Sequence, residues 1–85
     1  MRQYKFDGKA FDDFTGWAVT DRKLFGKIIE LLKNIDRDPY KGPGKPEPLK
    51  FNNSGFWSRR INEEHRLVYK VDKETIFIAS CKGHY

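Results

Sequence analysis

The chain has 85 residues, of which 17 are lysine or arginine and 12 are aspartate or glutamate, so its formal net charge is +5. This length indicates one small domain spanning residues 1–85, and a single cysteine excludes an intramolecular disulfide framework. No apolar run approaches the roughly 18 residues needed to span a membrane. The N-terminus also lacks the long apolar stretch of a signal peptide, so we expect a cytoplasmic protein.

The positive charge is concentrated in the second half of the chain. Residues 1–38 contain eight lysines and arginines against seven acids, whereas residues 39–85 contain nine against five. Such an excess can contact phosphate groups or an acidic partner. It is also compatible with an ordinary soluble protein that has a basic surface.

The first half predicts a short strand followed by two helices. Tyr4 and Phe6 alternate with polar residues, as strand residues do. Asp7 can cap the first helix and Thr20 the second, which must end before Pro39. The second helix has one strongly apolar face, formed by Leu24, Ile28, Leu31, Leu32 and Ile35.

The second half predicts a loop followed by short strands. Residues 39–48 hold all four prolines and form the loop. The expected strands cover residues 49–51, 56–61, 65–71 and 75–81, and their tight spacing favours an antiparallel meander. Arg66, Val68 and Lys70 share one face of the third of these strands. We therefore predict an α+β domain with a small antiparallel, partly mixed sheet, two helices on one face and Arg66 on the other.

Metal or cofactor chemistry is poorly supported. His65, Cys81 and His84 are the only soft metal ligands, and they lack the paired spacing of known metal motifs. Cys81 lies in the apolar alternation of the last strand, where a buried thiol is usual. No glycine-rich loop precedes a helix to hold a phosphate. We expect neither a metal nor a cofactor.

The residue types fit metal-free cleavage of RNA better. This reaction needs a base for the 2′-hydroxyl, cations for the charge that gathers on phosphorus, and an acid for the leaving 5′-oxygen. RNA carries its own nucleophile, so no activated side chain is required. A terminal aromatic, Tyr85, can stack on an unpaired base. The side chains that supply the other functions are Glu47, Arg66, Lys50 and His84, with Arg59, Arg60 and Lys45.

Each of these residues also has an ordinary structural interpretation. Glu47 can be an exposed loop acid paired with Lys45 or Lys50, and Arg66 can be a solvated strand residue. Residues 84–85 can be a frayed terminus.

Three further residues are more typical of structure than of chemistry. Trp57 and Tyr69 are more often core than base-stacking residues, and His65 is expected to make a structural hydrogen bond. A non-catalytic module that binds RNA or the ribosome therefore stays open, as does a protein that only binds a partner.

Residues 44–69, together with the C-terminal residues 81–85, resemble the YoeB/Txe family of bacterial toxins, part of the RelE-like superfamily. The matching words are GKPEPLK, SGFWSRRINEEHRLVY and the C-terminal HY. The resemblance implies a RelE-like fold and a ribosome-dependent mRNA endonuclease that cuts the codon in the ribosomal A site. It also implies inhibition by a YefM/Phd-type antitoxin and contact with operator DNA only through that complex, and it allows a homodimer.

The resemblance implies roles for three catalytic residues. Glu47 matches the family's general base and His84 its general acid. Arg66 matches the arginine that stabilises the phosphate in the transition state.

The resemblance also implies contacts with the substrate. Tyr85 matches the terminal aromatic that orients it, and Lys50 matches a supporting cation. Arg59 and Arg60 match a basic pair that is expected to contact the backbone of mRNA or rRNA. Gly83 stands where some relatives carry an aromatic, so no base contact is assigned there and codon preference stays open.

Overall fold

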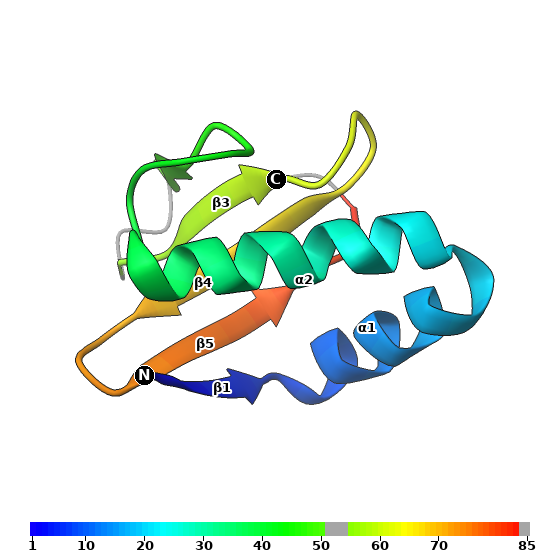
Figure 1. Ribbon diagram of the computed structural model, residues 1–85, viewed down its shortest axis with the longest axis horizontal. Coiled ribbons are helices and arrows are strands. Elements are labelled where there is room, and N and C mark those ends of the chain that lie inside the picture. Colours follow the sequence, from blue (N-terminus) through cyan, green and yellow to red (C-terminus); the bar gives the residue numbers. More distant parts are fainter. Residues whose placement is uncertain (51–54, 84–85) are drawn as a thin grey trace.

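The computed structural model describes residues 1–50 and 55–83, which form two helices and one five-stranded sheet (Figure 1). The elements are β1 (Gln3–Phe6), α1 (Gly8–Thr20), α2 (Arg22–Arg37), β2 (Glu47–Pro48), β3 (Trp57–Arg60), β4 (Arg66–Val71) and β5 (Thr75–Ser80). The strand order is β1-β5-β4-β3-β2, with β1 parallel to β5 and all other neighbours antiparallel. The predicted α+β class and mixed sheet are confirmed. Neither helix of the described residues is long and apolar enough to cross a membrane.

Aspartate side chains determine where both helices begin. Asp7 accepts a hydrogen bond from the amide of Lys9 (3.2 Å) and starts α1, as predicted. The predicted cap at Thr20 is wrong, because Asp21 accepts from the amide of Leu24 (3.1 Å) and caps α2. The Thr20 hydroxyl instead donates to the Gly16 carbonyl (3.0 Å), so Thr20 remains the last residue of α1.

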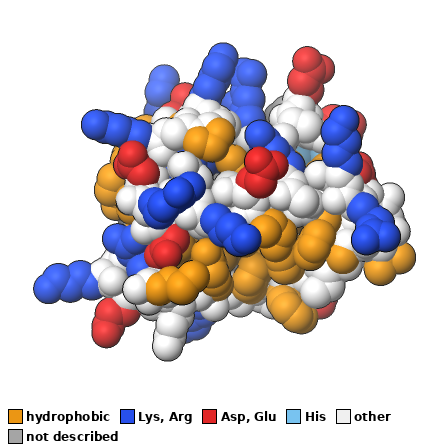
Figure 2. Space-filling view, viewed as in Figure 1, with side chains coloured by type: hydrophobic (Ala, Val, Ile, Leu, Met, Phe, Trp, Pro, Cys, Tyr) orange, Lys and Arg blue, Asp and Glu red, His pale blue; other side chains and the backbone are white. Residues whose placement is uncertain are grey.

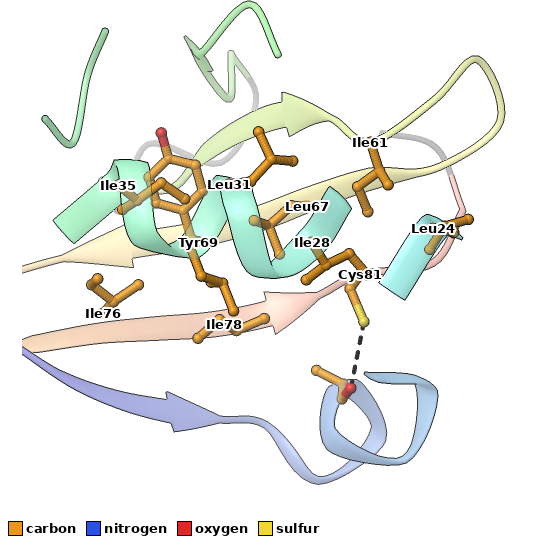
Figure 3. Packing of buried hydrophobic residues seen from close by; sticks show 12 residues of the cluster. Leu24, Ile28, Leu31, Ile35, Ile61, Leu67, Tyr69, Ile76, Ile78 and Cys81 are labelled. Carbon is orange, nitrogen blue, oxygen red and sulfur yellow. Dashed lines mark hydrogen bonds between the residues drawn. The ribbon is translucent and has the colours of Figure 1, made fainter. Parts of the chain in front are cut away.

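The apolar face of α2 forms the core against one face of the sheet (Figure 3). All five apolar residues predicted for this face are buried. Their partners on the sheet side are Ile61, Leu67, Tyr69, Ile76, Ile78 and Cys81. Burial of this continuous apolar surface is the main favourable contribution to folding, and it confirms that the helices cover one face of the sheet.

One predicted strand is misplaced. The structure has no strand at Leu49 and Lys50, and Phe51 lies outside the described residues. Strand β2 is instead formed by Glu47 and Pro48, the last two residues of the predicted loop. The reason is tertiary, because these two residues pair with Ser58 and Trp57 of β3, whereas their local sequence is typical of a loop. The other predicted strands are confirmed within one residue at each end.

The two faces of the molecule differ in charge. On the helix-covered face, lysine and arginine side chains are mixed with acidic ones over α2, and apolar side chains lie below them (Figure 2). The face of the sheet opposite the helices carries Arg66 and Lys70 of β4, because side chains alternate along a strand. Arg60 lies opposite Arg66, and Glu47 lies opposite Ser58. Within the described strands, Glu47 is thus the one acid on a basic open face.

Candidate active site

Glu47 and Arg66 meet on the open face of the sheet. One guanidinium nitrogen of Arg66, Nη1, lies 3.4 Å from Glu47 Oε1 and also donates to the hydroxyl of Ser58 (3.3 Å). The Glu47 side chain is 61% exposed, whereas that of Arg66 is 17% exposed. The cation paired with Glu47 is therefore Arg66 and not Lys45 or Lys50. An accessible carboxylate thus stands beside an arginine that its neighbours hold in place.

The backbone around Glu47 is constrained on both sides. Gly44 and Lys45 both adopt positive φ (85° and 50°), which turns the chain just before β2. The amide of Arg60 donates to the Gly44 carbonyl (2.7 Å), and the amide of Leu49 donates to the Phe56 carbonyl (3.0 Å). Glu47 therefore sits between two backbone contacts with the chain that forms β3.

The last described residue is held at the Arg66 end of β4. The amide of Arg66 donates to the Gly83 carbonyl (2.9 Å), and the amide of Gly83 donates to Nδ1 of His65 (2.9 Å). The His65 ring packs edge-on against Trp17, with 4.9 Å between ring centroids. The structural hydrogen bond predicted for His65 is confirmed. The predicted residues His84 and Tyr85 follow Gly83 directly and lie outside the described residues.

The structure corrects the prediction for Arg59. Its side chain is 0% exposed, so it cannot contact the backbone of mRNA or rRNA as predicted. The guanidinium makes five hydrogen bonds to acceptors inside the protein. The signal was present in the sequence, since Arg59 lies two residues from both Trp57 and Ile61 and therefore shares their core-facing side of the strand. Its neighbour Arg60 is exposed, so its predicted contact with RNA stays a prediction.

The remaining predicted residues fall into two groups. Lys50 is exposed after β2, so its contact with substrate stays a prediction. Tyr69 is fully buried and Trp57 packs against the core, as predicted. Burial raises the pKa of Tyr69 above its ordinary value of 10.0. Sequence reasoning missed Ser58, whose contact with Arg66 depends on strand register alone.

Cys81 has the environment of a structural thiol. It is 0% exposed, and its sulfur donates to the Ala10 carbonyl (3.5 Å; dashed line in Figure 3). Burial raises its pKa from 9.0 to about 11. Nucleophilic cysteines instead have lowered pKa values and partial exposure, so the prediction of a buried, unreactive thiol is supported.

The site offers acid–base and cationic groups. Among the residues that the structure describes, no three His, Cys, Asp or Glu side chains are grouped so that they could hold a metal ion. Glu47 can accept a proton from a nearby hydroxyl, and Arg66 retains donors that can bind an anion. Together they could take up a phosphodiester with its neighbouring hydroxyl.

Comparisons with known proteins agree on one family. The model of the YoeB-like toxin of bacterial type II toxin-antitoxin systems matches residues 6–85. Toxin YoeB of Escherichia coli strain K12 is 54% identical over 77 residues, which cover 91% of this chain and 92% of the relative. The solved YoeB dimer from Staphylococcus aureus superposes with a TM-score of 0.94 at 53% identity, covering 99% of this chain and 98% of that one. The YoeB-YefM complex from the same organism gives a TM-score of 0.90 at 51% identity, covering 100% and 99%.

Proposed function

Because this chain belongs to the YoeB-like toxins of bacterial type II toxin–antitoxin systems, we propose that it is an endoribonuclease that cuts mRNA in the ribosomal A site. Cleavage there would stop translation. The observation that carries the proposal is the Glu47–Arg66 pair on the open, basic face of the sheet. This pair supplies a base and a phosphate-binding cation at one accessible position.

The proposed reaction uses the 2′-hydroxyl of the RNA as nucleophile and needs no metal. Glu47 takes the hydroxyl proton while the 2′-oxygen attacks the adjacent phosphorus. Arg66 donates hydrogen bonds to the phosphate oxygens, on which negative charge increases in the transition state. The bond to the 5′-oxygen breaks, and that oxygen takes a proton from His84. The products are a 2′,3′-cyclic phosphate and a 5′-hydroxyl.

Binding of the RNA involves further residues around this pair. Arg60 lies directly opposite Arg66 in the strand register and is exposed, so it can contact a neighbouring phosphate. Lys50 is exposed after β2 and can act in the same way. Tyr85 is proposed to stack on a base of the codon, as aromatic side chains do with unpaired nucleotides.

The proposed partners are the ribosome and a YefM-type antitoxin. The solved complex of a similar chain pairs YoeB with YefM, and the net charge of +5 of this chain favours an acidic binding segment. We propose that the antitoxin inhibits the toxin in that complex, and that contact with operator DNA occurs only through it. A homodimer is the proposed form of the free toxin, by analogy with the solved dimer.

Mapping of mRNA ends in a translation reaction tests the proposal. The wild type, Glu47→Ala and His84→Ala are each added to a purified translation system, and mRNA 5′ ends are located. We expect frequent cuts within the A-site codon for the wild type and at most residual cutting by Glu47→Ala and His84→Ala. Glu30→Ala is the matched control, because it removes an exposed acid from α2, and it should cut like the wild type. Equal arrest by all variants with intact mRNA would instead indicate a non-catalytic ribosome-binding module.

A further inference from the structure

Arg59 is the largest fully buried side chain in the described part of the protein. Its Nε donates to the Tyr69 hydroxyl (3.2 Å), and Nη1 donates to Asn34 Oδ1 (2.6 Å) and the Pro43 carbonyl (3.2 Å). Nη2 donates to the carbonyls of Asp38 (2.8 Å) and Lys41 (2.9 Å). A guanidinium has five N–H groups, so every donor of Arg59 has a partner.

All five acceptors are neutral oxygens, and three of them belong to the backbone of the loop after α2. The Tyr69 hydroxyl adds a fourth loop carbonyl, because it donates to Pro39 (2.7 Å). Removing a charge from water is costly unless it is fully hydrogen-bonded. The arrangement therefore makes Arg59 a central anchor for residues 38–43. A lysine in its place has three donors without the planar geometry and could not serve the same acceptors.

Two glycines allow the loop to approach this anchor closely. Gly42 has φ 120°, and a Cβ there would collide with the Asn34 side chain. Gly44 has φ 85°, and a Cβ there would lie 2.9 Å from the Arg60 carbonyl oxygen and 3.0 Å from the Arg59 Cβ. The backbone of the loop thus packs directly on the strand that carries Arg59.

The anchored loop leads into β2, whose own residues offer few backbone donors to the sheet. Strand β2 has only two residues, and Pro46 and Pro48 have no N–H to donate. Within residues 46–48, Glu47 therefore has the only backbone donor. Its side chain is largely exposed, so packing does not fix it either. The position of the carboxylate therefore depends on the backbone contacts on either side of it, and the one on the N-terminal side, at Gly44, belongs to the chain that Arg59 holds.

We propose that Arg59 is a positioning residue for Glu47: by binding the 38–43 loop it sets where the carboxylate stands relative to Arg66. The inference rests on the proposed function, in which Glu47 is the base. A base displaced by about 1 Å can lose on the order of 100-fold in rate. The described residues proposed to bind RNA, Arg60 and Lys50, are exposed, so binding should not depend on this placement.

A double-mutant cycle in single-turnover cleavage on programmed ribosomes tests the proposal. We expect Arg59→Lys to lower the rate at saturating toxin by about 10-fold or more and to leave the half-saturating toxin concentration within about 2-fold. In the Glu47→Ala background, the same substitution should change the residual rate by less than about 2-fold, because its effect passes through Glu47. An equal loss in both backgrounds, or a change in half-saturation alone, would overturn the proposal.

Two further variants separate positioning from stability. Leu24→Ala removes a core side chain near the start of α2. Its cleavage rate per folded molecule should match that of the wild type, even if its Tm falls as much as that of Arg59→Lys. Tyr69→Phe removes one acceptor of Arg59 and the donor to the Pro39 carbonyl. It replaces Arg59→Lys as the test variant if Arg59→Lys does not fold. It should lower the saturating rate by about 3-fold in the wild type and not in Glu47→Ala.

Hydrogen exchange provides a readout that does not require activity. The Glu47 amide should exchange at least about 10-fold faster in Tyr69→Phe than in the wild type, while amides of β5 keep their rates. Unchanged exchange at Glu47 would overturn the positioning role. If the wild type does not cleave mRNA but exchange is faster in the variant, the proposed function is contradicted. The role of Arg59 in holding the loop before Glu47 is then still supported.

Discussion

Ionisation of Cys81 should reduce the stability of the fold at alkaline pH. The thiol is 0% exposed, and burial raises its pKa from 9.0 to about 11. The charge of Asp13 raises the pKa further, whereas Lys9 and Lys82 lower it. The unfolded chain therefore loses the thiol proton first as pH rises, which favours unfolding. The stabilising contribution is fully present below pH 9 and is lost as pH rises towards 11.

The size of the effect follows from the difference between the two pKa values. A shift of about two units corresponds to a total of ~2.7 kcal/mol. Most of this loss lies above pH 9, because the unfolded thiol is still protonated at lower pH. Near pH 10 the free energy of unfolding should be lower by ~1.4 kcal/mol, and near pH 8 by less than about 0.1 kcal/mol.

Urea unfolding of the wild type and Cys81→Ala at both pH values measures this loss. The variant has no thiol, so the stability advantage of the wild type should shrink by ~1.3 kcal/mol between about pH 8 and pH 10. Tyr4 and Tyr69 also have raised pKa values, but they are present in both proteins and cancel. A reducing agent keeps the thiol free. A difference that does not change with pH would refute the assignment of Cys81 as a buried structural thiol.

Three further predictions concern the site and its supports. Glu47→Gln should lower the cleavage rate by about 100-fold or more. The Tm of this variant should stay within about 8 °C of the wild-type Tm, because an exposed ion pair contributes up to ~1 kcal/mol. A larger fall in Tm, measured by thermal denaturation, would indicate that Glu47 has a structural role. Asp72 accepts two backbone hydrogen bonds that lower its pKa below 3.8. Asp72→Ala should therefore reduce Tm at neutral pH, and the deficit should disappear as pH falls through that lowered pKa; a deficit that persists in acid would contradict this account. Gly44→Ala should cost about 1–3 kcal/mol in urea unfolding, because φ is 85° and the new Cβ meets a carbonyl oxygen at 2.9 Å. Gly16→Ala is its control, in an open helical position, and should stabilise by up to ~1 kcal/mol; equal effects of the two would refute the argument.

Periodicity in the sequence determined most of the architecture. The spacing of Leu24, Ile28 and Ile35 predicted the buried face of α2, because a helix brings residues three and four apart to one side. Alternation along residues 66–71 predicted which side chains face the helices and which face away. These patterns are local, so they can be read without knowing the partner surface.

Charge led the sequence interpretation to a wrong assignment at one position. Arg59 and Arg60 are both cations and match a basic pair of the family, which suggested a pair of RNA contacts. The two side chains point to opposite faces of β3, so that Arg60 is exposed and Arg59 is buried. A buried arginine needs five acceptors, and these come from Asn34, Tyr69 and the loop after α2. The local sequence around Arg59 contains none of these acceptors.

The sequence by itself thus determined the α+β class, the helix-covered face and the family, since these depend on local periodicity and on matching motifs. Only the tertiary structure decided that Glu47 lies in a strand and that it pairs with Arg66, 19 residues away. It also decided that Arg59 holds the loop before Glu47. The physical reason is that strand pairing and burial depend on surfaces from distant parts of the chain, and the free energy they contribute overrides the loop preference of a proline-rich segment.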